Sequence, residues 1–237
     1  MGNIPLSINS YVDSPYFANT SQYSTYILDL KNDANVVWKN FDRGSVRWAI
    51  KRAKKEGVTV RESKDPVDIK EFFYLNTMTK KNLGVPCHPL YFFINIFSTL
   101  EDKCRLYLSE RDQEIIGGGL MLHYKDQVIY GYGAADPSSL KYHPYNAFIW
   151  QSIQDACVEG KKLYDFGRCS HSNAGLMDFK RRWGTTDIPL RYSNYPPQSR
   201  SGLARSGTLV DFGSKILRVI PFQMYIKLSD RVFGELG

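Results

Sequence analysis

The spacing of hydrophobic positions changes near Lys103, from a helical period before it to a strand-like period after it. Between Ala34 and Lys55 apolar side chains recur at helical spacing, with an interruption at Arg43-Gly44 and a stop at Gly57. This pattern predicts two helices joined by a bend. A strand over Thr25–Leu30 is expected to precede them.

Two further helices are predicted before the change in period. Asp65-Pro66 is typical of a helix start, because Asp caps the first turn and Pro fits its first position. Ile69, Phe72 and Phe73 give that helix its buried face. The second helix is expected to run from Pro89 to Leu100.

After Lys103 the period of two predicts a three-stranded meander, over Cys104–Leu108, Ile115–Tyr124 and Gln127–Gly133. A helix over about 145–159, a strand over Leu163–Phe166, a helix over about 174–183 and a strand near 189–193 complete the order β-β-β-α-β-α-β. This mixed order requires a crossover helix that returns to a parallel neighbour. In such sheets ligands bind beyond the strand ends where the pattern switches.

Composition indicates a globular chain, with 43% hydrophobic and 14% aromatic residues. Lys and Arg number 31 against 24 for Asp and Glu, and this excess favours an anionic partner such as phosphate, nucleic acid or a membrane face. The four cysteines and four histidines show no metal-ligand spacing, so no metal is expected. We interpret the cysteines as reduced thiols of a cytosolic protein, because neither a signal-peptide pattern nor a membrane-spanning apolar run is present.

Candidate chemistry gathers in residues 160–184. A short apolar strand ends in Asp165-Phe166-Gly167-Arg168, and Phe179-Lys180-Arg181-Arg182-Trp183-Gly184 follows on the next element. A buried strand tip followed by cations and aromatic side chains is typical of a site for an anionic substrate that develops charge. A Lys-Arg-Arg run is also common on a solvated helix face.

Six motifs over about residues 25–195 resemble the FemAB-like branch of the GNAT acyltransferase superfamily. They are Arg47-x-x-Ile50-x-x-Ala53, Thr79 with Gly84-Val85-Pro86, Tyr130-Gly131-Tyr132-Gly133-Ala134-x-Asp136, Trp150-x-x-Ile153-x-x-Ala156, Asp165-Phe166-Gly167-Arg168 and Gly175-x-x-x-Phe179-Lys180-x-x-Trp183-Gly184. The resemblance implies an α+β fold, a GNAT-like mixed sheet flanked by helices, with the remnant of a first GNAT-like unit at the N-terminus. It implies three parts: a partial first unit with connecting helices (1–60), a GNAT-like acyltransferase domain (61–195), and a linker with an amphipathic tail (196–237).

The resemblance also implies an activity, because members of this branch transfer an aminoacyl or acyl group to an amine, often on a cell-wall or surface-polysaccharide precursor. Lys180 matches the family lysine that stabilises the oxyanion of the tetrahedral intermediate. Beside it, Phe179 is a candidate wall for a sugar, a base or an acyl group, or a plain core residue.

Other candidate roles follow from the chemistry of the residues. Asp136 and Asp165 are candidates for taking up the amine proton or orienting an arginine, although an Asp that closes a strand, as Asp165 does, is more often structural. Arg168 and Arg47 are suited to bidentate phosphate binding, although Arg47 lies on a basic helix where a solvated role is as plausible. Tyr132 and Trp183 complete the expected substrate-binding set.

The identity of the donor stays open. The glycine-spaced loop that binds the acetyl-CoA pyrophosphate is replaced by 138–144, and Gly117-Gly118-Gly119 lies inside a predicted strand, where it indicates a bulge or a close backbone approach. We expect no tightly bound cofactor, and acyl-CoA or aminoacyl-tRNA as co-substrate. The expected partners are an anionic envelope precursor, free or lipid-linked, and tRNA.

Residues 209–236 are amphipathic, with apolar positions interleaved with Lys215, Arg218, Lys227 and Arg231. One interpretation is a terminal helix that docks on its own domain or on a twin subunit in a homodimer. The other is an anchor on the inner face of the membrane. For the whole chain, the alternative to an enzyme is a non-catalytic relative that binds nucleic acid or an anionic glycan through its basic groove.

Overall fold

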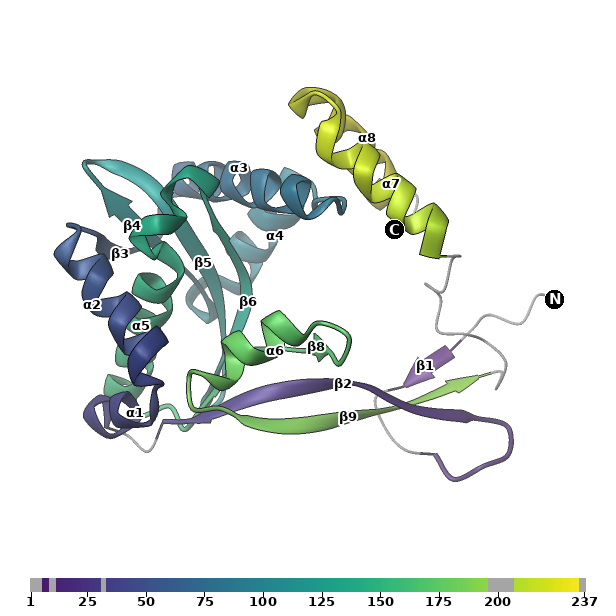
Figure 1. Cartoon of the computed structure of the whole chain (residues 1–237), viewed down its shortest axis with the longest axis horizontal. Helices are drawn as coiled ribbons and strands as arrows, with labels where there is room; N and C mark the ends of the chain where they lie inside the picture. Colours follow the sequence, from purple (N-terminus) through teal and green to yellow (C-terminus); the bar gives the residue numbers. More distant parts are fainter. Residues whose placement is uncertain (1–5, 9–11, 31–32, 196–206, 235–237) are drawn as a thin grey trace.

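A nine-stranded mixed sheet organises the computed structural model, which describes residues 6–8, 12–30, 33–195 and 207–234 (Figure 1). Its strands follow the order β1-β9-β2-β7-β6-β5-β4-β3, and β8 pairs with β2 off this path. The strands are β1 (Leu6–Ile8), β2 (Ala18–Asp29), β3 (Thr59–Ser63), β4 (Cys104–Arg111), β5 (Glu114–Tyr124), β6 (Gln127–Ala135), β7 (Leu163–Asp165), β8 (Cys169–Ser170) and β9 (Thr186–Tyr195).

The predicted strand order from residue 104 onward is confirmed. Strands β4, β5 and β6 form the antiparallel meander, and α5 (Pro144–Val158) crosses over to place β7 parallel to β6. Strand β3 was not among the predicted strands. It pairs antiparallel with β4 at one end of the sheet order, and its polar, largely exposed residues carry no clear period-two signal.

Helices cover both faces of the sheet, and each face has its own hydrophobic core. On one face lie α3 (Pro66–Leu83) and α4 (Leu90–Leu100), which contribute Ile69, Phe72 and Phe93 to the core beneath them. The other face is covered by α5, with α1 (Ala34–Asn40) and α2 (Trp48–Lys55) beside it. The two layers flank the meander (Figure 1).

The predicted bend between the first two helices and the predicted helix start at Asp65-Pro66 are confirmed. A short π-helical turn, η1 (Arg43–Arg47), separates α1 from α2, and the carboxylate of Asp42 accepts a hydrogen bond from the Ser45 amide at its start. The Asp65 carboxylate caps α3 through the Val67 amide, with Pro66 at the first helical position. Gly84 ends α3 in the left-handed region (φ 71°), as a helix C-terminus favours.

Strands β2 and β9 form a long antiparallel ribbon that extends beyond the meander (Figure 1). Strand β2 begins at Ala18, seven residues before the predicted start at Thr25. Its first half pairs with β9 and, at Tyr23, also with β8, and it lacks the buried positions that mark the second half. Strand β2 also pairs with β7, so the described N-terminal residues complete the sheet of the 61–195 domain. The proposal that they descend from a first GNAT-like unit stays a prediction.

The glycine triplet Gly117–Gly119 lies inside β5, as predicted, and allows a close approach to the helices. A Cβ on Gly119 would lie 2.5 Å from Cε2 of Phe148 on α5, and one on Gly118 would lie 2.8 Å from Cδ2 of Leu108. The triplet therefore lets α5 sit against the sheet and does not form a phosphate-binding loop.

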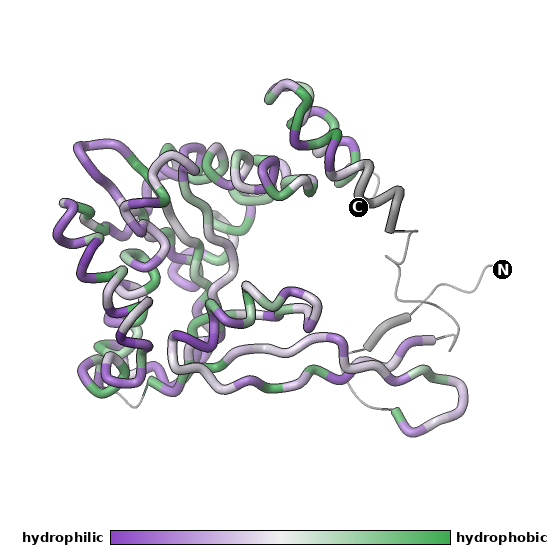
Figure 2. The backbone as a smooth tube through the Cα atoms, in the orientation of Figure 1, coloured by the Kyte–Doolittle hydropathy of each residue, from purple (hydrophilic) through white to green (hydrophobic). Residues whose placement is uncertain are grey.

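Two helices at the C-terminal end, α7 (Gly207–Val219) and α8 (Phe222–Gly234), lie against the end of α3 (Figure 1). Tyr225 is fully buried there and its hydroxyl donates to the Val85 carbonyl at 2.6 Å, while the buried Ser229 hydroxyl accepts from the Cys87 amide. Hydrophobic and hydrophilic residues alternate along the coloured part of these helices (Figure 2), and Val219, Met224 and Leu228 are exposed. The linker predicted at 196–206 lies outside the described residues.

Among the described residues, no helix combines the length and the apolar character needed to cross a membrane.

Candidate active site

The parallel strands β6 and β7 separate after a short contact, and a cavity opens where they part. Their pairing joins only Gln127–Ile129 to Leu163–Asp165, after which β6 continues to Ala135 while β7 ends. The cavity has a volume of about 570 Å³, and we call it the splay cavity. Its lining consists of Asn76, Thr79, Lys80 and Leu83 from α3, Tyr130–Gly133 from β6, Tyr145 from α5, Phe166–Arg168 after β7, and Leu176, Phe179 and Lys180 from α6 (Ala174–Arg181).

A bulge in β6 shapes the floor of the splay cavity. The pairing with β5 shifts register between Leu120 and Met121, opposite Gly131, which turns the next side chain to the other face of the sheet. Tyr130 therefore faces α5 and contacts Phe148, whereas Tyr132 faces α3 and α4 and contacts Phe93. The predicted substrate residue Tyr132 thus lines the cavity with its ring held by neighbouring aromatic side chains.

Lys180 lines the splay cavity with only 4% of its surface exposed. Its ammonium donates to the Gly167 carbonyl at 2.8 Å and to the Arg168 carbonyl at 3.2 Å, and it lies 5.5 Å from the centre of the Tyr26 ring. An ammonium carries three N–H donors, so one remains for a ligand. Burial lowers the pKa of Lys180, an effect that the charges of Cys169 and Asp165 oppose.

The turn that holds Lys180 is itself fixed by Asp165. The Asp165 carboxylate accepts from the Thr25 hydroxyl at 2.6 Å and from the Gly167 amide at 2.7 Å. Gly167 adopts a φ of 76°, a conformation that favours glycine, and its carbonyl is directed to Lys180. Asp165 therefore positions Lys180 through the turn at Gly167. This is a structural role, one of the alternatives that the sequence left open for Asp165.

Arg168 and Phe179 lie beside Lys180 in the same lining. The Arg168 guanidinium stacks 4.6 Å above the Tyr23 ring and donates to the Tyr192 hydroxyl at 3.2 Å. Both contacts leave N–H groups of the guanidinium available to an anion. Phe179 is half-buried, with its ring edge against Trp183.

Besides Asp165, three of the predicted site residues are absent from the lining of the splay cavity. The Asp136 carboxylate is not part of this lining and instead caps the short helix η3 (Pro137–Tyr142), where hydrogen bonds from Ser138 lower its pKa. Asp136 and Arg168 therefore do not share the lining of the splay cavity. Trp183 is fully buried between Phe41 and Phe166, so it belongs to the core and not to a substrate surface.

Arg47 is likewise absent from the splay cavity. It ends η1 in a half-buried position, and its Nε has no hydrogen-bond partner in the structure.

The α3 wall contains polar residues that the sequence reasoning missed. Asn76 is fully buried, yet neither its amide nitrogen nor its amide oxygen has a hydrogen-bond partner in the structure. One turn later, the half-buried Lys80 has its pKa lowered by burial. The spacing of Ile69, Phe72 and Asn76 continues one helical stripe, so a polar side chain on a core-facing stripe was the available signal.

No lining residue of the splay cavity is a carboxylate or an imidazole. Its tyrosines are poor bases at neutral pH, because burial raises the pKa of Tyr130, Tyr132 and Tyr145. The cavity therefore offers cations, hydroxyls and aromatic walls. Among the described residues no cluster of His, Cys, Asp and Glu is arranged to hold a metal ion.

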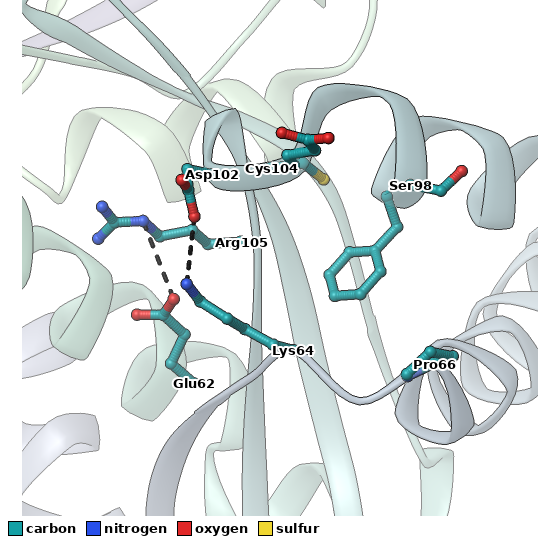
Figure 3. A pocket seen from close by; sticks show the side chains of 9 residues that line it. Glu62, Lys64, Pro66, Ser98, Asp102, Cys104 and Arg105 are labelled. Carbon is teal, nitrogen blue, oxygen red and sulfur yellow. Dashed lines mark hydrogen bonds and ion pairs between the residues drawn. The ribbon is translucent and has the colours of Figure 1, made fainter.

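A larger cavity, of about 1040 Å³, lies near β3, the last strand in the sheet order, and we call it the edge cavity (Figure 3). Its charges are directed at one another: Lys64 contacts Asp102 at 3.2 Å, and Arg105 contacts Glu62 at 3.9 Å. It holds none of the predicted site residues.

Comparison with known proteins places this fold and site in a family. Residues 41–181 match the acetyltransferase (GNAT) domain family, which is more than half of the chain, and the protein belongs to that family. The matched region ends just beyond Lys180 and includes every residue of the splay cavity lining.

The proteins to which the chain is similar include an alanyltransferase and FemX. The chain is 28% identical over 146 residues to the UDP-N-acetylmuramoylpentapeptide-lysine N(6)-alanyltransferase of Weissella viridescens, an alignment that covers 60% of this chain and 43% of that enzyme. The fold matches the crystal structure of FemX with a TM-score of 0.66 at 18% identity, over 72% of this chain and 61% of that one. L-PGS from Bacillus licheniformis matches with a TM-score of 0.57 at 14% identity, over 86% and 67%. The chain spans less than half the length of the Weissella enzyme.

Proposed function

We propose that this protein is an aminoacyltransferase that moves an aminoacyl group from a tRNA to an amine of a cell-envelope precursor. The observation that carries the proposal is the position of Lys180, buried in the splay cavity and held by two backbone carbonyls with one N–H left over. The relationship to an alanyltransferase that acts on a peptidoglycan precursor supports the choice of acceptor.

The chemistry is aminolysis of an ester. The acceptor nitrogen attacks the aminoacyl carbonyl carbon, a C–N bond forms, and the C–O bond to the tRNA ribose breaks. Lys180 would donate its remaining N–H to the oxyanion of the intermediate. Because the lining has no carboxylate or imidazole, the amine proton would pass to the departing ribose oxygen, directly or through water.

Two features support aminoacyl-tRNA over acyl-CoA as the donor. Between β6 and α5 the chain forms η3, and Pro144 occupies the first position of α5, so one amide that could bind a pyrophosphate is missing. The segment from Lys39 to Lys55 is strongly basic, as RNA binding requires.

The alternative, a non-catalytic relative that binds nucleic acid or an anionic glycan, predicts a Lys180 that points into open solvent. The side chain is instead buried beside Arg168 at the end of β7, and this favours an enzyme.

The test is transfer by the purified protein, with a mixture of aminoacyl-tRNAs, or acyl-CoA in a parallel reaction, and UDP-linked muramyl pentapeptide as acceptor. We expect mass spectrometry to show an acceptor heavier by one aminoacyl residue in the tRNA reaction only. Lys180→Met serves as the inactive control. Product from acyl-CoA alone would overturn the choice of donor. The absence of product from every donor would overturn the proposal that the protein is an enzyme.

A peripheral contact with the cytoplasmic membrane face is the proposal for localisation. Exposed Val219, Met224 and Leu228, close in sequence to Lys215 and Lys227, supply the apolar and basic groups that an anionic bilayer attracts. Val219→Ser with Met224→Ser should reduce co-sedimentation with phosphatidylglycerol vesicles while the melting temperature stays unchanged. Unchanged sedimentation of the double variant would remove the membrane contact.

A further inference from the structure

A third cavity lies on the side of α6 opposite the splay cavity, and it has no role in the site described above. It has a volume of about 420 Å³ and is lined by residues of η1, α2, α5 and α6, among them Ser45, Trp48, His143, Asn146 and Arg182. Phe179 lines this cavity and the splay cavity alike. Helix α6 therefore stands between the two cavities, with Lys180 in one lining and Arg182 in the other.

Trp48 is the unusual residue of this third cavity, which we call the Trp48 cavity. More than half of its side chain (54%) is exposed, and the ring of His143 packs edge-on against it at 5.1 Å. The other three tryptophans are shielded: Trp183 is fully buried, and Trp38 and Trp150 are half-buried and pack on each other at 5.1 Å. An exposed, braced indole in a hollow is a platform on which a flat ring can stack.

The surface next to Trp48 carries a high density of positive charge. Seven basic residues and one acidic residue occur between positions 39 and 55, the basic ones being Lys39, Arg43, Arg47, Lys51, Arg52, Lys54 and Lys55. Lys51 and Arg52 follow Trp48 by three and four positions, which places them on the same helix face. One of these cations, Arg52, also forms an ion pair, with Glu56.

We infer that the Trp48 cavity binds an unpaired nucleotide of single-stranded RNA, with the base stacked on Trp48 and the phosphates beside the basic face of α2. The inference rests on the proposed function, because it places the 3′ end of the donor tRNA on one side of α6 and the acceptor on the other. The aminoacyl ester at the end of that RNA must still reach Lys180 in the splay cavity, and Phe179, which lines both cavities, lies between the two. A neutral sugar would also stack on Trp48 but would not need the cations of α2.

The test uses binding and not transfer, so that it can fail independently of the proposed function. The probe is a short uncharged RNA ending in CCA, added to the full chain while tryptophan fluorescence is recorded. We expect saturable quenching that disappears in Trp48→Phe, where the reporting indole is gone. By gel shift, Trp48→Ala should bind the RNA roughly 5- to 150-fold more weakly, the range for loss of one stacked base.

Matched variants separate stacking from general charge. Tyr91→Ala removes a comparably exposed aromatic ring (58%) from α4 and should leave RNA affinity unchanged. Lys51→Ala should weaken binding of every RNA sequence alike and make it less dependent on salt.

Three outcomes would overturn the inference. They are no quenching by RNA, equal loss of affinity in Tyr91→Ala and Trp48→Ala, or quenching of Trp48 by N-acetylglucosamine but not by RNA. Transfer activity with a Michaelis constant for aminoacyl-tRNA that Trp48→Ala leaves unchanged would refute the Trp48 site and preserve the proposed enzyme. RNA binding at Trp48 without any transfer would support the Trp48 site and refute the proposed enzyme.

Discussion

The splay cavity and the edge cavity differ in what their charged groups contact. In the edge cavity, about 1040 Å³, Lys64 and Arg105 face Asp102 and Glu62, so these four charges are paired (Figure 3). In the splay cavity, about 570 Å³, Lys180 contacts carbonyl groups, Arg168 contacts one aromatic ring and a hydroxyl, and Asn76 has no hydrogen-bonding partner among the described residues. Hydrogen-bonding capacity left unused, and not volume, distinguishes the candidate active site.

This difference has a thermodynamic side. A buried polar group without a partner destabilises the folded state by roughly 1–3 kcal/mol, so a chain that keeps one has a reason to do so. The surface pair Lys64–Asp102, whose side chains are 77% and 88% exposed, contributes little to stability. Substitutions in the splay cavity should therefore change stability or activity strongly, whereas substitutions in the edge cavity should change both little.

The largest effect is expected from Lys180→Met, which keeps the length of the side chain and removes its charge. Turnover should fall about 100-fold or more, the typical loss for one oxyanion donor, while the fold is retained. Transfer kinetics and a thermal melt measure both. Arg181→Met is the matched control, because Arg181 points to Asp187 at 2.7 Å and should leave turnover near normal. Full turnover in a folded Lys180→Met protein would exclude the oxyanion role.

The lowered pKa of Lys180 predicts how turnover changes at alkaline pH. Burial lowers its pKa below the ordinary value of 10.5, and only the protonated form donates to an oxyanion. Turnover should therefore be complete below that lowered pKa and fall as the pH rises through it. In Lys180→Met the residual rate should lack this fall, and a fall unchanged in the variant would assign it to another group.

Lys80→Met tests the cation on the α3 wall. A charged hydrogen bond contributes roughly 1.5–3 kcal/mol, so loss of the ammonium should lower kcat/KM by about 10- to 100-fold if Lys80 contacts a substrate anion. Lys81→Met is the control, because Lys81 donates to the Arg218 carbonyl of α7, away from the cavity. Equal effects of the two substitutions would show that α3 acts only as a scaffold.

Asn76→Leu should separate stability from activity. Replacing the unpartnered amide with an apolar side chain of similar size should raise the melting temperature by about 2–4 °C for each kcal/mol gained, and lower kcat/KM by a few-fold to about tenfold. Thr77→Val is the contrast, since the equally buried Thr77 hydroxyl donates to the Phe73 carbonyl at 2.7 Å. That substitution should lower the melting temperature and leave activity unchanged. A less stable Asn76→Leu protein would contradict the argument.

The smallest effect is expected in the edge cavity. Lys64→Met and Asp102→Asn each break one exposed ion pair, and transfer rates should stay within about twofold of the unaltered protein. A loss comparable to that of Lys80→Met would make the edge cavity part of the site and end the distinction between the two cavities.

Local patterns in the sequence were sufficient for most elements and for part of the site. The period-two meander, the Asp65-Pro66 helix start and the strand ending at Asp165 depend on neighbouring residues, and they fold as predicted. The Phe179-Lys180 pair was found in the same way, from a short run beside a strand tip. Such signals survive because helix caps and strand alternation are decided over a few residues.

The tertiary structure alone decided the remainder. Trp183 has the residue type of a site but is enclosed by Phe41 and Phe166, which come from other segments of the chain. Asp136 instead caps η3 through hydrogen bonds from Ser138, two residues away, so this contact is local and lies within reach of the sequence. Asn76 and Lys80 join the site only because β6 and β7 separate and α3 closes over the gap, and Trp48 joins its cavity because residues of η1, α2, α5 and α6 line the same hollow. The sequence determined which side chains carry chemistry, whereas long-range packing determined which of them meet.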